Sequence, residues 1–409
     1  TLIFSPLIIF FRILKKKEDK KRYKEKFCFP SKKRISGNLI WFHGSSVGEL
    51  LSILPLVQEL EKNKSINQIL ITTSTLSSAQ IFKKFNFKKT IHQFFSIDSI
   101  FFSYKFLNYW KPTIAIFVES EIWPSIFKIL NKKKIPLKLL NARITKKTFN
   151  KWRRVKKFSN SVFQNISIAY PQNEETFNYL KKLNVSKIKK IGNLKFFNNQ
   201  QSKFSKLDNT FLKNINLKKI WCASSTHPGE EIICANAHIN LKKKYKNLLT
   251  IIIPRHIHRV NKIVEEIKSL DLNIVLHSSR PKKLDNTDIY LVDTYGETQK
   301  FYQSSDIVFM GKSISGKGGQ NPLEPTNLGS TVLYGPNVDN FKDTYKLLNK
   351  LKVAYKVNGV KSLTHSIDKL ITNPNNKKNY LKIAKIGKKI LNETKDEINS
   401  LFNNEIKKT

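Results

Sequence analysis

The chain has 409 residues, of which 40% are hydrophobic and 11% aromatic, and its formal net charge is +44. This length can form two domains with separate cores, and the apolar content excludes an intrinsically disordered chain. The charge could indicate nucleic-acid binding, an anionic membrane surface or an acidic substrate. Lysines are spread along a chain rich in Ile, Asn and Phe, with no repeated basic motif. We therefore attribute the high positive charge to compositional drift and to attraction by an anionic membrane surface. We expect no nucleic-acid partner.

The N-terminus is an apolar and aromatic run, residues 2–14, followed at once by Lys15, Lys16 and Lys17. This run is shorter than the roughly 20 apolar residues that span a bilayer. A cleaved signal peptide would carry its charges before the apolar run and not after it. We interpret residues 1–37 as a membrane-anchoring segment with a basic flank on the cytoplasmic side. The alternative is a buried first helix.

From residue 38 the chain alternates short β-rich runs with helical segments, which favours a parallel, doubly wound sheet. The predicted strands of this first unit cover residues 39–42, 68–73, 92–97, 113–118, 137–140 and 167–169. A polar stretch, 198–213, then interrupts the pattern and predicts a linker. The pattern resumes with predicted strands at residues 219–223, 248–253, 273–276, 289–292, 307–310 and 331–334. Two such units place ligands at the carboxyl ends of their strands.

Polar residues follow several predicted strands of the first unit. Glu49 falls in the first turn of a helix after the loop HGSSVG, where it is either a helix cap or a general base. Glu119 opens the segment ESEIWP, Asn141 follows the next strand, and Lys195 lies in the segment GNLK. Their repeated placement after strands predicts a site at this edge.

The second unit repeats this placement. Arg255 follows a strand and can grip two phosphate oxygens with its planar guanidinium. The glycine-rich loop of residues 311–327, GKSISGKGGQNPLEPTN, follows another strand and leads into a predicted helix start at Asn321-Pro322. Glycines and a helix N-terminus suit a phosphate, and Glu324 could accept from a sugar hydroxyl. The spacing matches neither a P-loop nor the G-x-G-x-x-G dinucleotide fingerprint.

Metal chemistry is not indicated. Cys28, Cys222 and Cys234 have no metal-ligand spacing and are typical of reduced cytosolic thiols. Lone histidines such as His227 and His256 are more often structural than metal ligands.

Eight segments occur in the order found in the Kdo (3-deoxy-D-manno-octulosonic acid) transferases of lipopolysaccharide assembly. They are HGSSVGE, ESEIWP, NARITKKTF, GNLKFF, SSTHPGEE, PRH, DTYGE and GGQNPLEP, and they extend over roughly residues 40–347. The chain resembles this family over most of its length. The resemblance implies a GT-B fold, with two Rossmann-like domains facing across a cleft.

The implied domains are an acceptor-binding domain (38–200), a linker (201–214) and a donor-binding domain with C-terminal helices (215–409). The implied reaction transfers Kdo from CMP-Kdo to a glucosamine hydroxyl of a lipid A precursor, with inversion and without a metal or other cofactor. The implied location is the cytoplasmic face of the inner membrane. The alternatives are a GT-B enzyme using another nucleotide sugar and a non-enzymatic basic membrane- or nucleic-acid-binding protein.

The resemblance also implies roles for individual residues. Glu49 would be the general base, and Glu119 and Lys195 would stabilise the transition state. The residues that would hold CMP are Pro254, Arg255, Tyr295, Gly296, Glu297, Asn321, Pro322, Leu323 and Glu324. Gln320 departs from the family, which usually has His in this place; a glutamine can still form hydrogen bonds but cannot carry a charge.

Overall fold

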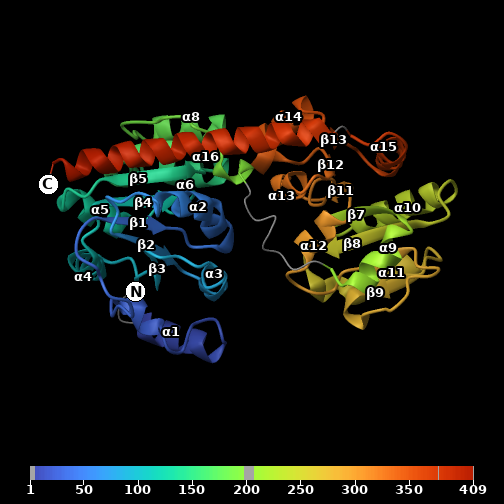
Figure 1. Cartoon of the computed structure of the whole chain (residues 1–409), viewed down its shortest axis with the longest axis horizontal. Helices are drawn as coiled ribbons and strands as arrows, with labels where there is room; N and C mark the ends of the chain where they lie inside the picture. Colours follow the sequence, from blue (N-terminus) through green and yellow to red (C-terminus); the bar gives the residue numbers. More distant parts are fainter. Residues whose placement is uncertain (1–4, 198–206, 376, 409) are drawn as a thin grey trace. The chain divides into compact units, whose positions relative to one another are not determined.

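The structure, a computed structural model, describes residues 5–197, 207–375 and 377–408. The chain divides into two compact units: unit 1 comprises Thr1–Phe197 with Gly387–Thr409, and unit 2 comprises Asn198–Ile386. Each unit contains one parallel sheet covered by helices (Figure 1). The expectation of two Rossmann-like α/β domains is confirmed.

Unit 1 has a six-stranded sheet in the order β3-β2-β1-β4-β5-β6. Its strands are β1 (Leu39–His43), β2 (Gln68–Thr73), β3 (Thr90–Phe94), β4 (Ile114–Val118), β5 (Leu137–Ala142) and β6 (Ile166–Pro171). Its helices before the unit boundary are α1 (Ser5–Leu14), η1 (Tyr23–Phe27), α2 (Val47–Leu60), α3 (Leu76–Phe82), α4 (Ile100–Trp110), α5 (Pro124–Lys132), α6 (Lys146–Arg154), α7 (Lys156–Phe163), α8 (Glu174–Lys182) and η2 (Leu194–Phe196). All six predicted strands are present, with ends shifted by a few residues.

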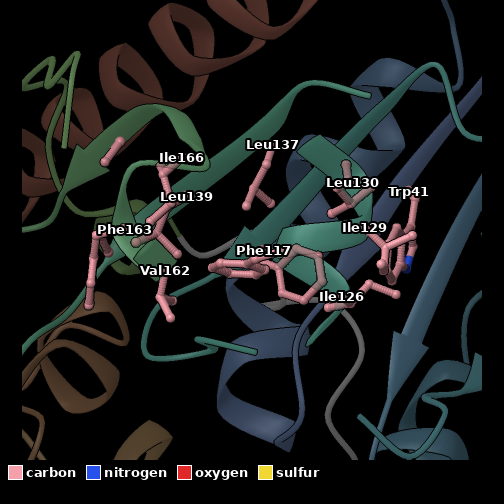
Figure 2. Packing of buried hydrophobic residues seen from close by; sticks show 14 of the residues in the cluster. Trp41, Phe117, Ile126, Ile129, Leu130, Leu137, Leu139, Val162, Phe163 and Ile166 are labelled. Atoms are coloured by element: carbon pink, nitrogen blue, oxygen red, sulfur yellow. The ribbon is translucent and has the colours of Figure 1, made fainter. Parts of the chain in front are cut away.

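The central strands β1 and β4 are buried along their whole length. This burial agrees with their largely apolar sequences, LIWFH and IAIFV, since helices cover both faces of a doubly wound sheet. On one face, Trp41 of β1 packs against Phe106 of α4 and Phe117 of β4, with ring centroids 4.7 and 5.0 Å away. Side chains of α5 and α7 complete this core (Figure 2). The sheet is therefore a rigid support for the loops at its carboxyl edge.

Unit 2 has a seven-stranded sheet in the order β13-β12-β11-β7-β8-β10-β9. Its strands are β7 (Lys219–Thr226), β8 (Leu248–Pro254), β9 (Ile274–Leu276), β10 (Ile289–Leu291), β11 (Ile307–Met310), β12 (Thr331–Tyr334) and β13 (Ala354–Lys356). Its helices are α9 (Asn209–Asn216), α10 (Glu230–Lys242), η4 (Ile257–Arg259), α11 (Val260–Lys268), η5 (His277–Ser279), α12 (Thr298–Gln303), α13 (Leu323–Asn327), η6 (Asp339–Phe341), α14 (Lys342–Lys350) and α15 (Val360–Thr372).

Two predictions for unit 2 need correction. The predicted linker, 201–214, overlaps α9, which begins at Asn209; its first part, 201–206, lies outside the described residues. The side chain of Phe211 from α9 packs against Tyr290 with ring centroids 4.8 Å apart, and this contact makes the helix part of the unit. The edge strand β13 was not predicted, because three residues ending in a lysine give too short a pattern.

The sequence predicted that the C-terminal helices belong to the second domain. The last helix, α16 (Lys377–Ile406), instead belongs only in part to that domain. It begins in unit 2 and crosses into unit 1 at Gly387. There Glu397 accepts from the Tyr170 hydroxyl at 2.9 Å and from Lys189 Nζ at 2.5 Å. A Cβ atom at Gly387 would lie 2.4 Å from the Phe196 carbonyl oxygen, so glycine allows this close approach. Residues 387–408 are therefore an integral part of the first domain.

The predicted basic flank of the N-terminal segment is partly built into unit 1. Glu25 accepts from the backbone N–H of Phe94 at 2.7 Å, and Arg34 donates to the Trp110 carbonyl at 2.6 Å. Before this flank, α1 carries five large apolar side chains that are each more than half exposed: Leu7, Ile8, Phe10, Phe11 and Leu14. Over the described residues, the length and apolarity that a membrane-crossing helix needs are not found together in any helix.

Candidate functional site

The strand order of unit 1 reverses between β1 and β4, its two central strands. β2 and β3 follow β1 on one side, and β5 and β6 follow β4 on the other. The chains leaving β1 and β4 therefore diverge, and open α/β sheets bind ligands at such a switch point. Glu49 follows β1 and Glu119 follows β4, so the structure places both predicted catalytic carboxylates at this position.

The position of Glu49 is set by the start of α2. Ser46 is the N-cap, and its hydroxyl accepts from the Glu49 backbone N–H at 3.4 Å. In return, the Ser46 backbone N–H donates to Glu49 Oε2 at 2.9 Å, which completes a capping box. A Cβ atom at Gly44 would lie 3.1 Å from Glu49 Cβ. The cap occupies Oε2 and leaves Oε1 as the oxygen that can take a proton.

Glu119 and Lys195 form an ion pair, with 2.6 Å between Glu119 Oε1 and Lys195 Nζ. Glu119 is only 4% exposed and has a φ of +57°, which is unusual for a residue with a side chain. Asn141, at the end of neighbouring β5, also has a positive φ, of +50°. Its side-chain oxygen accepts from the Leu194 backbone N–H at 3.1 Å, which orients the short helix η2 that carries Lys195. Such strained positions cluster at functional sites.

Burial, together with the charges around it, makes Glu49 a stronger base than an ordinary carboxylate. Burial and the negative charge of Glu121 raise the pKa of Glu49 to about 7, and Glu119 adds to this increase. The Ser46 N–H and the Lys195 ammonium oppose it. A carboxylate whose pKa lies near neutrality is well suited to general base catalysis.

The predicted nucleotide-binding residues lie at the carboxyl edge of the unit 2 sheet. Pro254 ends β8, and the exposed Arg255 follows it, held by a 3.1 Å hydrogen bond from its backbone N–H to the Thr226 carbonyl. Tyr295, 71% exposed, and Gly296, with a φ of +90°, follow β10. Glu297 forms an ion pair with Lys300 at 2.6 Å. Asn321, Pro322, Leu323 and Glu324 follow β11.

The glycine-rich loop after β11 differs from the phosphate cradle that its sequence predicted. The fully buried carboxylate of Glu230 accepts from the backbone N–H groups of Lys312, Ser313 and Ile314 at 2.7 to 2.9 Å. It also accepts from the His227 N–H at 2.9 Å and from Ser315 at 3.4 Å. A carboxylate therefore occupies the anion nest in the first half of the loop, so only its second half could bind a phosphate. The segment SSTHPGEE contains Glu230, but its role in this loop was not predicted, because a carboxylate at the N-terminus of α10 gives no signal beyond that of a helix cap.

The second half of the loop leads into α13, which has five residues and begins at Leu323, one residue after the predicted first helical position, Pro322. The predicted N-cap, Asn321, lies one residue before the observed N-cap, Pro322, and its side-chain oxygen accepts from the Leu323 N–H at 3.1 Å. Leu323 is buried and supports the turn, whereas Glu324 is exposed. Gln320 is held through its backbone carbonyl, which accepts from the Tyr345 hydroxyl at 3.1 Å.

Within residues 5–197, 207–375 and 377–408, no group of three or more His, Cys, Asp or Glu side chains has the arrangement of a metal site. His227, His256 and His258 lie near one another, with neighbouring ring centroids 5.8 and 5.5 Å apart. The candidate residues form two groups, one in each unit. The carboxylates and the lysine at the sheet edge of unit 1 can move a proton, and the arginine at the sheet edge of unit 2 can bind an anion.

Comparison with known proteins gives one consistent family. The family model described as "3-Deoxy-D-manno-octulosonic-acid transferase (kdotransferase)" matches residues 21–198. The chain is 34% identical over 407 residues to the 3-deoxy-D-manno-octulosonic acid transferase of Rickettsia bellii, covering 97% of this chain and 96% of that protein. It is 28% identical over 372 residues to the enzyme of the same name from Haemophilus influenzae, covering 89% of this chain and 85% of that one.

A putative UDP-N-acetylglucosamine 2-epimerase from Listeria monocytogenes has a similar structure. It superimposes with a TM-score of 0.62 at 12% identity, covering 90% of this chain and 98% of that one. At this identity the likeness concerns the fold alone, and it agrees with two Rossmann-like domains of the GT-B type.

Proposed function

The chain belongs to the Kdo transferase family and is a glycosyltransferase, and from this premise we propose that it moves Kdo from CMP-Kdo to a glucosamine hydroxyl of a lipid A precursor. The observation that carries the proposal is the cluster of Glu49, Glu119 and Lys195 at the switch point of the unit 1 sheet. This cluster combines a base of near-neutral pKa with a buried ion pair, as an attack by a sugar hydroxyl requires.

In the proposed reaction, Glu49 accepts the proton of the acceptor hydroxyl as that oxygen attacks the anomeric carbon of Kdo. The new glycosidic bond forms as the bond between the anomeric carbon and the CMP phosphate oxygen breaks. The electron pair leaves with CMP, and attack from the opposite face inverts the anomeric centre. Glu119 and Lys195 stabilise charge that develops in this transition state.

The donor half of the proposal rests on unit 2. Arg255 supplies a fixed positive charge for the phosphate of the departing CMP. The turn of Tyr295, Gly296 and Glu297 and the segment of residues 321–324 would hold the remainder of the nucleotide. The leaving group is a phosphate of low basicity, so its departure needs charge stabilisation more than a strong acid.

The direct test incubates the purified full chain with CMP-Kdo and a tetraacylated lipid A precursor, followed by mass spectrometry of the lipid. The expected product is heavier by one or more Kdo residues, and transfer should continue in the presence of EDTA. A panel of UDP and GDP sugars in the same assay separates this activity from that of a GT-B enzyme with another donor. Release of UDP or GDP, with CMP-Kdo left intact, would contradict the proposal.

We also propose that α1 docks the enzyme on the cytoplasmic face of the inner membrane. The five exposed apolar side chains of this helix and the following Lys15–Lys17 support this placement, since such a helix can lie in the headgroup layer of an anionic bilayer. Flotation with phosphatidylglycerol-containing vesicles tests it. The triple variant Ile8→Ser, Phe10→Ser, Phe11→Ser should float poorly, whereas equal flotation of both proteins would contradict docking through α1.

A further inference from the structure

A third carboxylate, Glu121, lies beside the proposed catalytic cluster and has no role in the mechanism above. Three donors converge on its Oε2 atom: His43 Nε2 at 3.1 Å, Ser45 Oγ at 2.5 Å and Trp123 Nε1 at 2.8 Å. Its side chain is only 13% exposed. Three donors on one oxygen match a carboxylate, which can only accept.

Glu121 therefore carries a fixed negative charge. Burial by itself would raise the pKa of this carboxyl, but hydrogen bonds from His43, Ser45 and Trp123 outweigh burial and hold the pKa below its ordinary range. Such stabilisation of the charged form keeps the group ionised throughout the range in which Glu49 titrates.

The donors to Glu121 are fixed by the core of unit 1. His43 is completely buried, and its Nδ1 lies 2.9 Å from Thr72 Oγ1, which also accepts from Trp41 Nε1 at 2.9 Å. Burial lowers the pKa of His43, so the imidazole is neutral. Because the Glu121 carboxylate can only accept, the single ring proton lies on Nε2. Nδ1 is then an acceptor for the Thr72 hydroxyl, which shares its proton with the Phe42 carbonyl oxygen, 3.3 Å away. A chain of hydrogen bonds thus runs from β2 through β1 to Glu121.

The same short loop holds both Glu121 and Glu49. Ser45 donates its hydroxyl to Glu121, and the next residue, Ser46, donates its backbone N–H to Glu49. The charged groups that act on Glu49 are Glu121 and Glu119, which disfavour its ionised form, and Lys195, which favours it. Glu119 is paired with Lys195, whereas the partners of Glu121 are all formally neutral.

We propose that Glu121 is a positioning residue of the transfer reaction: its fixed negative charge strengthens Glu49 as a base, and its bond to Ser45 holds the loop that orients Glu49. This inference rests on the proposed function, in which Glu49 takes the acceptor proton. When Glu49 gains that proton it becomes neutral, and its repulsion from Glu121 disappears. Glu121 therefore favours the proton transfer through Glu49.

The test is the pH profile of kcat/KM for the full chain and for Glu121→Gln, with CMP-Kdo and the lipid A precursor. Glutamine keeps an acceptor oxygen for the three donors and removes only the charge. The acid limb should move to lower pH by about one unit, and the plateau should fall a few-fold because Glu49 becomes a weaker base. The matched control is Glu59→Gln. Glu59 lies on α2, as Glu49 does, but ten residues or about 15 Å further along the helix, so its replacement should leave the acid limb of the pH profile in place. An acid limb of Glu121→Gln that coincides with that of the wild type would overturn the proposal.

Two further variants separate charge from structure. Glu121→Asp keeps the charge but draws it away from its donors, so its rate should fall while the acid limb stays near the wild-type position. A purely structural role predicts rate losses for the Asp and Gln variants with no shift of the limb in either. If circular dichroism shows that Glu121→Gln does not fold, Glu121→Ala replaces it in the test. Its acid limb should also move to lower pH. Absence of Kdo transfer by the wild type would contradict the proposed function, and wild-type turnover by Glu49→Gln would contradict only the role of Glu49 as the base. An impaired Glu49→Gln with an unshifted Glu121→Gln profile would contradict only the role of Glu121.

Discussion

Lys195 Nζ lies 2.6 Å from Glu119 Oε1, and this pair joins two loops that are 76 residues apart in the sequence. Glu119 is almost fully buried at the end of β4, so its charge depends on the ammonium group for compensation. The pair brings a positive and a negative group to the edge of the sheet where Glu49 lies in the first turn of α2.

Removal of the Glu49 carboxylate should greatly slow transfer without unfolding the protein. Glu49→Gln keeps an oxygen for the Ser46 N–H and so preserves most of the capping box. General base catalysis contributes about 10²- to 10⁴-fold, and we expect a loss of this size in kcat. Calorimetric titration with CMP should give the wild-type affinity, because CMP is assigned to unit 2. A variant with wild-type turnover would show that another group is the base.

The activity should depend on pH through Glu49. The base must be ionised, and the pKa of Glu49 is raised to about 7, so kcat/KM should fall tenfold per pH unit as the pH decreases below about 7. An unperturbed glutamate would place this limb near pH 4.3. A profile measured from pH 5 to 9 distinguishes the two, and a flat profile above pH 5 would rule out the raised pKa.

Replacement of Lys195 should cost stability as well as activity. Lys195→Met leaves the buried Glu119 charge without compensation, a change that typically destabilises by about 3–5 kcal/mol. Urea unfolding should show this loss. The double variant Lys195→Met, Glu119→Gln should recover most of the stability but none of the activity. Equal stability of the single and double variants would mean that the charges of Lys195 and Glu119 do not stabilise each other.

Arg255→Ala should weaken CMP binding. A lost hydrogen bond to a charged group costs about 1.5–3 kcal/mol, which corresponds to roughly a 10- to 150-fold increase in Kd. Lys262→Ala, an exposed side chain of α11, is the control for a lost positive charge in unit 2 and should bind CMP normally. If Arg255→Ala changes only the apparent affinity for the acceptor, the donor assignment is wrong.

Glu230 should prove essential for the shape of the glycine-rich loop. Glu230→Ala leaves the buried N–H groups of Lys312, Ser313 and Ile314 without an acceptor, each at a cost of about 1–3 kcal/mol. We expect a lower unfolding temperature and weaker CMP binding. Alanine at the neighbouring exposed Lys317 should change neither property. A stable Glu230→Ala variant with normal CMP affinity would show that water replaces the carboxylate at no cost.

The sequence predicted the sheets better than the contacts made by individual residues. Long buried strands such as β4 produce unbroken apolar runs, and loops after them carry the polar residues of the site, so both were visible in the sequence. The role of Glu230 was not visible in the sequence. Its partners are backbone N–H groups about 80 residues away, and every residue type except proline has such a group, so the sequence does not reveal which of them bind it. The hydrogen bond from Ser45 to Glu121 was hidden for a similar reason, since it joins the ends of two strands that are neighbours only in space.

The path of α16 has a consequence for how the protein is made. Its residues Ile390, Ile398 and Phe402 are buried, and they belong to the part of the helix assigned to unit 1. On the ribosome, the first domain to emerge therefore lacks a piece of its core until synthesis reaches the last turns of α16. A polypeptide ending at residue 200 would present the same apolar surface to solvent, so a separately expressed first domain should require residues 387–409 supplied in trans or by fusion.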